Sequence, residues 1–476
     1  MFSTVRELLA FIRKEEVAAI DFKACDLLGR WHHITLPASR ADETLFEDGV
    51  GFDASSFPGF KTVESGDMVL LPDVPTAFVD PFFQDSTVSV VCSVVEAASR
   101  AAFPRDPRGV AARAEAFMRA SGIADRAPFG PEFEFYLLDR VTYRNDTCAG
   151  SYEIACREGR LDGGTEGRYE GVTLAPKGGY HAIPPEDRYC NVRCEAVRLL
   201  ETAGVDVRYH HHEVGSLGQQ EIEVNLQPLT KAGDVAILVK YFVRMVAERH
   251  GLVATFMPKP FHGEAGTGMH FHQHLFKDGR PLFHDPAGYG RLSRLAFHYT
   301  AGLLSHAPAL LGLTNPSTNS YRRLVPGYEA PVNAFFSLGN RSAAIRIPGY
   351  ATQPAETRIE FRPPDPTCNP YLAMAAMLLA GLDGVKKGID PTTAGFGPYD
   401  KNVFDMSEEE RRERIKPLPT SLEDALAALD ADFGFLVEGG VFDESLVRDW
   451  CRIHRERCEA VRRRPHPFEV EQLLGC

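Results

Sequence analysis

Four short segments of the sequence carry charged or histidine side chains at alternate positions, with apolar residues between them. They are residues 130–137 (GPEFEFYL), 218–224 (GQQEIEV), 268–275 (GMHFHQHL) and 357–362 (TRIEFR). Because successive side chains of a strand point to opposite faces, each segment predicts a β-strand with one polar and one apolar face. One such strand alone is explained by a solvated face. Glu-x-Glu and His-x-His are poor choices for a solvated face, so the four segments together indicate a functional site.

The residues on these polar faces have the chemistry of a metal and phosphate site. They are Glu132, Glu134, Glu221, Glu223, His270, His272, His274, Arg358, Glu360 and Arg362. Carboxylates with an imidazole suit Mg²⁺ or Mn²⁺, and guanidinium groups suit phosphate or carboxylate. Such a mixture is costly to hold together unless cations and anions occupy it. If the four faces converge, we expect the site to bind a metal–nucleotide and an acidic substrate.

A second group of arginines lies in residues 315–331 and 340–346. It consists of Arg322, Arg323, Arg341 and Arg346. Taken alone, these residues are explained equally well as scattered surface arginines. The sequence has no Gly-x-x-x-x-Gly-Lys-Ser/Thr motif, so a bound ATP would not be held by a P-loop. The glycine-rich stretch 263–268 (GEAGTG) is by itself a weak signal.

The elements that must position these residues indicate an α+β protein with two domains. In residues 1–107 the pattern predicts a helix at 5–14 and strands at 17–23, 31–36 and 87–95, followed by a proline-containing linker at 103–108. In residues 108–476 it predicts strands around 129–138, 219–227, 268–276 and 356–362. Predicted helices there are 108–121, 187–203, 232–250, 292–306, 369–387, 421–431 and 444–464. Residues 388–419 predict a long surface loop with a short helix inside.

Composition excludes several classes of protein. The 476-residue chain has a net charge of -13, which argues against a general nucleic-acid binder. The ten cysteines are scattered and form no Cys-x-x-Cys pair, which is typical of free thiols in a reducing cytoplasm. The N-terminus lacks the apolar region of a signal peptide, and no apolar run of about 18 residues occurs. We therefore expect a cytoplasmic protein that binds neither membrane nor nucleic acid.

At the level of whole motifs, the chain resembles the type I (bacterial) glutamine synthetase family. The blocks that carry the resemblance are GPEFEF, HHEV with GQQE, FMPKP with GMHFH, NSYRRLVPGYEAP and RIEFRPPDP, in that order along the chain. The resemblance implies a small N-terminal β-grasp domain and a large catalytic α/β domain with a half-barrel antiparallel sheet. It also implies a dodecamer of two stacked hexameric rings, with each active site at a subunit interface.

The resemblance further implies a role for individual residues. Two Mg²⁺ or Mn²⁺ ions would be held at each active site, the first by Glu134, Glu213 and Glu221 and the second by Glu132, His270 and Glu360. ATP would contact His272, Arg346 and Arg358, and glutamate would contact Gly266, Arg323 and Arg362. Arg341 would stabilise the transferred phosphoryl group. Asp53 of a neighbouring subunit and Glu329 on a closing loop would serve the ammonium site.

Several positions depart from the family's pattern. Ala265 replaces an asparagine that helps to bind the substrate's amino acid end, and His274 stands where serine is common near the nucleotide. His274 is interpreted equally well as a changed adenine pocket or as a packed imidazole. The stretch 53–58 keeps Asp53 but changes its neighbours. Phe404 occupies the place of a tyrosine that is adenylylated in many enterobacterial relatives, so we expect no adenylylation there.

The function that follows from the resemblance is ATP-dependent ligation of ammonia to the γ-carboxylate of L-glutamate. The reaction proceeds through γ-glutamyl phosphate and gives L-glutamine, ADP and phosphate. The alternative is a ligase that uses an organic amine, such as methylamine, ethanolamine or a polyamine, and makes a γ-glutamyl amide. Asp53 and Glu329 favour ammonia because both suit a small cation, whereas the changes at 53–58 and 263–268 leave room for the amine. A non-enzymatic relative and a phosphagen-kinase-type reaction are the remaining, less favoured readings.

Overall fold

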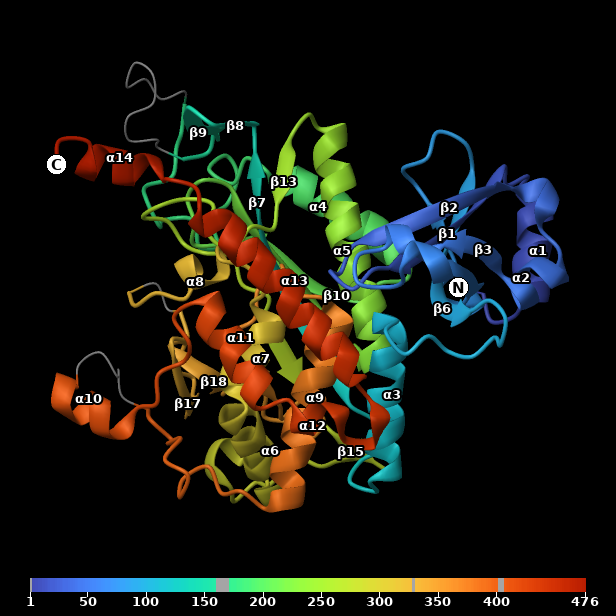
Figure 1. Cartoon of the computed structure of the whole chain (residues 1–476). Coiled ribbons are helices and arrows are strands. Elements are labelled where there is room, and N and C mark those ends of the chain that lie inside the picture. The colour runs from blue at the N-terminus through green and yellow to red at the C-terminus, as the bar shows by residue number, and fades with distance from the viewer. Residues whose placement is uncertain (1, 160–170, 328–329, 401–405) are drawn as a thin grey trace.

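Two β-sheets organise the chain, and each has helices packed against it (Figure 1). The computed structural model describes residues 2–159, 171–327, 330–400 and 406–476. The first sheet has six strands and is built from the N-terminal part of the chain, whereas the second has nine strands and is built from the rest. The mixture of helices and strands agrees with the predicted α+β class.

The six-stranded sheet runs in the order β2-β1-β6-β4-β3, and β5 pairs with β6. Its strands are β1 (Ala19–Cys25), β2 (Trp31–Pro37), β3 (Val50–Asp53), β4 (Asp67–Pro72), β5 (Phe78–Asp80) and β6 (Thr87–Glu96). Only β1 and β6 are parallel among its pairs. Helices α1 (Val5–Lys14) and α2 (Glu43–Asp48) flank it (Figure 1). Helix α1 buries Leu8, Leu9 and Ile12, a spacing that puts all three on one helical face.

The nine-stranded sheet runs in the order β10-β11-β7-β14-β19-β18-β17, and β12 and β13 pair with β7. Its strands are β7 (Pro128–Leu138), β10 (Val207–His212), β11 (Gln219–Val224), β12 (Gln227–Pro228), β13 (Val253–Thr255), β14 (Phe271–Gln273), β17 (Asn333–Leu338), β18 (Ala343–Ile347) and β19 (Ile359–Phe361). Strand β7 is buried along its whole length because strands pair with both of its edges. The sheet is antiparallel except for β17 and β18, which are parallel, and this edge pair departs from the antiparallel half-barrel that the resemblance implied.

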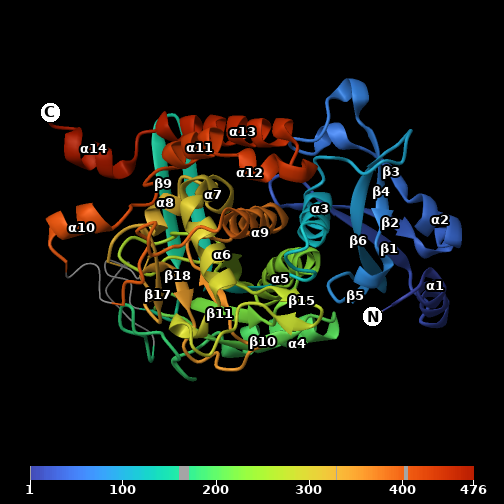
Figure 2. The same cartoon turned by 90° about the horizontal axis from the view of Figure 1, so that it is seen from below.

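Helices cover this sheet and connect it to the first one. The larger helices are α3 (Pro107–Ala120), α4 (Cys190–Thr202), α5 (Leu229–Arg249), α6 (Arg294–Ser305), α7 (Ala307–Thr314), α9 (Pro370–Lys387), α11 (Leu422–Ala431) and α13 (Glu444–Arg462). The shorter helices and strands are α8 (Ser320–Arg323), α10 (Glu408–Arg414), α12 (Gly434–Val437), α14 (Pro467–Leu473), β8 (Arg140–Asp146), β9 (Ala149–Ala155), β15 (Phe276–Lys277) and β16 (Arg280–Pro281). Figure 2 shows α9 between α5 and α11, and α9 packs against α3, α5 and α6.

Two polar contacts fix the first sheet to the helices of the second. Arg108 in the first turn of α3 binds Asp234 of α5, with 2.9 Å between Nε and Oδ1, and also Asp73 at the end of β4. Asn369 caps α9 and donates its side-chain amide to the carbonyl oxygens of Asp26 and Leu27, each at 3.1 Å. These buried contacts hold the two sheets in a fixed relation.

The predicted helices agree with the structure to within three residues at each end, and the short helix expected inside residues 388–419 is α10. The missed elements are helices α2, α7, α8, α12 and α14, strands β3, β4, β5, β10 and β13, the parallel pair β17–β18 and the hairpin β8–β9. The hairpin is mostly exposed on both faces, so it has no alternation of apolar and polar residues to find. Among the described residues, no helix is both long and apolar enough to cross a membrane.

Candidate active site

The glutamates predicted to share faces form rows across adjacent strands. Strands β7 and β11 pair so that Glu134 is opposite Glu221 and Glu132 is opposite Glu223. Strand β10 then places His211 opposite Glu221. Directly opposite residues of antiparallel strands lie about 5 Å apart and on the same face. The acidic groups are therefore neighbours because of strand register alone.

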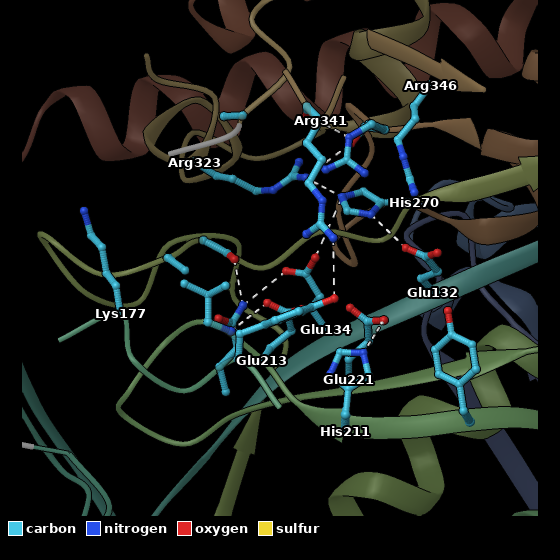
Figure 3. Close-up of a pocket in the computed structure, with 18 of the residues that line it drawn as sticks. Glu132, Glu134, Lys177, His211, Glu213, Glu221, His270, Arg323, Arg341 and Arg346 are labelled. Carbon is cyan, nitrogen blue, oxygen red and sulfur yellow. Dashed lines mark hydrogen bonds and ion pairs between the residues drawn. The ribbon is translucent and has the colours of Figure 1, made fainter. Parts of the chain in front are cut away.

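Strands β14 and β19 bring the histidines and Glu360 to the same place. The backbone N–H of Glu132 donates to the carbonyl oxygen of His270 at 3.0 Å, and His272 is opposite Glu360. Strand β18 adds Arg346 opposite Glu360. The side chains open into a cavity of about 370 Å³. The predicted residues that line it are Glu132, Glu134, Glu213, Glu221, Gly266, His270, Arg323, Arg341, Arg346 and Arg362, most of which Figure 3 labels.

The first acidic group contains Glu132 and Glu360 and is surrounded by histidine and arginine side chains. Glu132 accepts from His270 Nδ1 at 3.0 Å and from His272 Nε2 at 2.7 Å. Glu360 pairs with Arg346 at 2.5 Å and with Arg362. Burial raises the pKa of both carboxyls, but these neighbours outweigh it. The pKa of Glu132 falls well below its usual range, and the pKa of Glu360 falls to about 2. Both carboxyls are therefore charged at neutral pH.

The second acidic group contains Glu213 and Glu221 and has little cationic compensation. Glu221 lies 3.3 Å from His211 Nε2, and one Glu213 oxygen accepts from the backbone N–H of Val214 at 2.6 Å. Burial and then the neighbouring carboxylates, including Glu134, raise the pKa of Glu213 and of Glu221 well above the usual range. Buried like charges of this kind call for a bound cation.

Glu134 lies between the second acidic group and the glycine-rich loop 263–268. Its carboxylate accepts from the backbone N–H of Gly268 at 2.7 Å and from Gln219 Nε2 at 3.2 Å. Gln219 also donates to the carbonyl oxygen of Gly266 at 2.9 Å, and the Tyr136 hydroxyl donates to the carbonyl of Ala265 at 2.7 Å. A Cβ on Gly266 would lie 2.7 Å from Cγ of Arg323, so only glycine fits against that side chain.

Within the described part of the chain, three sets of side chains place ligand atoms within 4.8 Å of one another, as a metal ion requires. One set, Glu132, His270 and Glu360, is the set predicted for the second ion. Another, His211, Glu213 and Glu221, shares two members with the set predicted for the first ion and has His211 in the place of Glu134. The third is Glu132, Glu223 and His272. Their oxygen and imidazole donors fit a divalent cation such as Mg²⁺ or Mn²⁺. His211 and Glu223 were not among the predicted ligands, although the run of three histidines before Glu213 is a visible signal for the first.

The arginines of the cavity differ in how firmly they are held. Arg323 is buried and donates to the carbonyl oxygen of Pro363 at 2.7 Å, and it lies 3.2 Å from His270 Nε2. Arg362 donates to the carbonyl oxygen of Arg341 at 3.0 Å as well as pairing with Glu360. Arg341 is exposed and lies against Tyr180, with 3.4 Å between NH2 and the hydroxyl. Figure 3 shows the Arg341 side chain reaching into the cavity above the carboxylates.

A second cavity of about 400 Å³ contains two more residues of the polar faces, His274 and Arg358. His274 packs against Phe276 and Phe283, with ring centroids 4.4 and 5.1 Å apart. Burial lowers its pKa to about 3, so the imidazole is neutral. His274 is therefore both a packed imidazole and part of a cavity wall. Tyr350 lines the first cavity and touches Arg358 of the second, with 3.4 Å between its hydroxyl and NH2.

Of the predicted catalytic residues, Asp53 is described and lies away from the cavity. Asp53 ends strand β3 of the first sheet, where its carboxylate accepts from the backbone N–H of Ser55 at 2.9 Å, and it does not line the cavity. Glu329 lies outside the described residues, although Gly327 and Ala330 on either side of it line the cavity. Phe404 also lies outside the described residues.

Comparisons with known proteins agree with this geometry. Residues 16–97 match the family model of the glutamine synthetase beta-grasp domain, and residues 104–473 match that of the glutamine synthetase catalytic domain. Glutamine synthetases of Frankia alni and Mycolicibacterium smegmatis are 46% and 44% identical to the chain over 98% of both sequences. The fold superposes on Plasmodium falciparum glutamine synthetase with a TM-score of 0.88 (26% identity, 99% of both chains). It superposes on an ADP complex of a protein named GmaS with a TM-score of 0.81 (27% identity, 98% and 99% covered). The first sheet is thus a β-grasp domain and the second a half-barrel, and the chain belongs to the glutamine synthetase family and is a ligase.

Proposed function

We propose that this ligase joins ammonia to the γ-carboxylate of L-glutamate at the expense of ATP, through γ-glutamyl phosphate. The observation that carries the proposal is the convergence of six carboxylate or imidazole ligands with four arginines in one cavity. A carboxylate is a poor electrophile, so it must first gain a phosphate leaving group. Phosphoryl transfer asks a protein mainly for positioning and for cationic groups around the phosphate oxygens.

We assign two divalent cations, Mg²⁺ or Mn²⁺, to the cavity. Glu134, Glu213 and Glu221 would hold the first ion, with His211 able to join them. The other ligand set, Glu132, His270 and Glu360, would hold the second. When bound, the ions neutralise charge on the phosphate oxygens. Arg341 would stabilise the transferred phosphoryl group, which agrees with its exposed position at the cavity.

The two cavities suit a nucleotide that spans them. The triphosphate would lie in the first cavity near Arg346, and the base would lie in the second near Arg358. His272, the other predicted ATP contact, is buried and lines neither cavity. The ADP in the similar GmaS structure supports a nucleotide in this fold. Glutamate would also lie in the first cavity, against the backbone of Gly266 and the guanidinium groups of Arg323 and Arg362.

The nucleophile must be neutral ammonia, although ammonium predominates at pH 7. Asp53 of a neighbouring subunit would attract ammonium and accept its proton. Glu329 would cover the site and keep out water, which would otherwise hydrolyse the acyl phosphate. We expect Glu329→Ala to keep nucleotide binding and to lose most ligase turnover. Unchanged turnover would remove Glu329 from the mechanism.

An organic amine is the second candidate nucleophile, and the observation that favours it is Ala265. Its methyl group stands at the cavity where the family has a larger, polar side chain. The test supplies ATP, Mg²⁺ and glutamate with ammonium, methylamine, ethanolamine or putrescine, and identifies the amide by mass. We expect glutamine as the preferred product. A preference for one of the amines would replace ammonia in the proposal, and the absence of any amide would remove the ligase reaction.

We also propose a homo-oligomer, a dodecamer by family resemblance, whose active sites lie at subunit interfaces. The position of Asp53 in the first sheet requires a neighbour to bring it to a cavity. Helix α14 extends from the body of the subunit (Figure 1) and exposes Phe468, Leu473 and Leu474, as a segment that packs on another subunit would. Light scattering on Phe468→Asp tests this, because a charge there should reduce the particle mass. The division into domains at residue 107 and the cytoplasmic location stay predictions.

A further inference from the structure

A loop of unusual backbone shape, residues 175–183, forms one wall of the first cavity. Lys177 and His181 both have a φ of 57°, in the left-handed region that residues other than glycine rarely adopt. Such a conformation persists only where the surroundings impose it, and it is concentrated at functional sites. Both Lys177 and Tyr180 of this loop line the cavity.

The loop is fixed to the segment that carries Glu213. The backbone N–H of His181 donates to the carbonyl oxygen of His212 at 3.0 Å, and that of Gly179 donates to Val214 at 3.2 Å. These two hydrogen bonds attach the loop to His212 and Val214, the residues immediately before and after Glu213 in the chain. A Cβ on Gly179 would lie 2.4 Å from the carbonyl oxygen of Glu213 and 2.4 Å from the His212 ring, so the approach is as close as a glycine allows.

Three aromatic rings meet where this loop reaches the cavity. His181 stacks on Tyr180 with ring centroids 4.1 Å apart and an angle of 18°, and its ring edge meets His211 at 4.5 Å. Tyr180 and His211 are 5.5 Å apart. Those two rings line the cavity, whereas His181 does not and is exposed. His181 therefore contacts both cavity-lining rings from outside the cavity.

This aromatic wall borders the second acidic group. His211 Nε2 lies 3.3 Å from a carboxylate oxygen of Glu221, and Arg341 lies over the Tyr180 ring at 5.5 Å. Aromatic faces attract cations within about 6 Å, and ring edges and faces also occupy the space that a substituent on a nitrogen would need. A small ammonium ion suits such a wall better than an alkylammonium ion.

We propose that His181 is a positioning residue that fixes Tyr180 and His211 as a wall, and that this wall restricts the nucleophile to the size of ammonia. The inference rests on the proposed ligase function. It adds a residue outside the cavity as a determinant of nucleophile choice. His181 touches neither the reacting atoms nor the phosphate, so it acts through the two rings.

The test compares His181→Asn with His181→Phe in the full-length protein. Asparagine tolerates the left-handed backbone but removes the ring, whereas phenylalanine keeps a ring for stacking. The Michaelis constants and turnover numbers are measured for ammonium and for methylamine at saturating ATP and glutamate. His250→Ala, an exposed histidine at the end of α5, is the control, and ADP binding and thermal midpoints verify folding.

For His181→Asn we expect the KM for ammonium to rise about tenfold while kcat changes by less than about threefold. The methylamine-to-ammonium ratio of kcat/KM should rise about tenfold in His181→Asn. In His181→Phe the same ratio should stay within about twofold of the wild-type value. An unchanged ratio in a folded Asn variant overturns the inference, and so does a Phe variant as altered as the Asn variant. If Asn prevents folding, His181→Gly takes its place, since glycine adopts this backbone freely. A wild-type protein that makes no amide from either nucleophile overturns the proposed function itself, a different result from an unchanged ratio.

Discussion

The two acidic groups of the cavity have similar residues but opposite electrostatic states. In the first, Glu132 and Glu360 are matched by two histidines and two arginines, and their pKa values are depressed. In the second, Glu213 and Glu221 are close to other carboxylates, and their pKa values are raised. The charges of the first group are compensated largely by the protein before an ion binds, whereas those of the second group depend mainly on a bound cation. The cavity therefore has one acidic group whose charge is compensated and one whose charge is not. Such a cavity suits a cation that arrives with its substrate.

The contrast has a structural cause. The first group is on the side where strands β14, β18 and β19 bring histidines and arginines opposite the glutamates. The second is on the side of β10 and β11, where His211 lies 3.3 Å from a carboxylate oxygen of Glu221. The order of the strands therefore places most of the compensating side chains next to the first acidic group and few of them next to the second.

The largest effect is expected at Glu132, which belongs to two of the three ligand sets. Glu132→Gln should keep the fold but lower ligase turnover about a thousandfold, because it removes a charge on which the phosphate site depends. Glutamine formation measured by mass, with Glu248→Gln on the exposed surface of α5 as control, checks this. A loss of less than about tenfold would mean that this group is structural and not part of the site.

In the absence of metal, removing one carboxylate charge from the first acidic group and one from the second should have opposite effects on the stability of the protein. Glu213→Gln relieves repulsion and should raise the thermal midpoint by about 2 °C, whereas Glu360→Gln leaves Arg346 and Arg362 without their partner and should cost about 3 kcal/mol. Thermal unfolding in EDTA and then in Mg²⁺ makes the comparison. Mg²⁺ should stabilise the wild type more than Glu213→Gln. If both substitutions shifted the thermal midpoint in EDTA equally and in the same direction, the proposed difference between the two acidic groups would be contradicted.

The two cavities should separate binding from chemistry. Arg358→Ala, in the second cavity, should raise the KM for ATP about tenfold and change kcat little. Arg341→Ala, at the first, should lower kcat about a hundredfold with a smaller change in the KM for ATP. Steady-state kinetics at saturating glutamate and ammonium distinguish the two. If both variants changed the same constant, the assignment of the second cavity to the base would be wrong.

The sequence predicted the residues of long, regular strands well. Strand β7 is buried along its length and alternates Glu and Phe over residues 132–135, so Glu132 and Glu134 could be placed on one face from the sequence alone. Alternation failed where a strand was short. Strand β14 ends at Gln273, so His274 does not stay with His270 and instead lies in the second cavity with Arg358.

Residues outside regular strands could not be placed by periodicity. Glu213 follows the end of β10 in a connection without alternation, and only the family resemblance named it. Tyr180 and His181 lie in a loop whose shape depends on contacts with residues 212–214. Those residues are far from the loop in the sequence, so no local pattern predicts the contacts. Asp53 belongs to a different sheet, so no pattern within its own segment connects it to the site. Tertiary contacts, which a single sequence does not display, decide these positions.

The smallest effect is expected at a third cluster of one histidine and two carboxylates, which lies away from the cavity. His306 bridges Asp383 at 2.9 Å and Asp432 at 2.7 Å and stacks on Phe435. Burial lowers the pKa of His306, but the hydrogen bonds to Asp432 and Asp383 outweigh it, and the pKa is raised. A raised folded-state pKa stabilises the protein fully below the unfolded value of about 6.5. That stability is lost as the pH rises through the folded-state pKa. His306→Gln should therefore cost about 1 kcal/mol more at pH 6 than at pH 9, a small value because Asp432 is partly exposed.

Urea unfolding at the two pH values, in EDTA and in Mg²⁺, measures this cost, with His250→Gln as control. Unlike Glu213 and Glu221, the carboxylates of this cluster are matched by His306 and by Lys387, which lies 2.8 Å from Asp383. Mg²⁺ should therefore leave the cost of His306→Gln unchanged. An equal cost at both pH values would show that His306 acts by packing on Phe435 and not by charge. A dependence on Mg²⁺ would show that this cluster also binds a cation, despite its balanced charges.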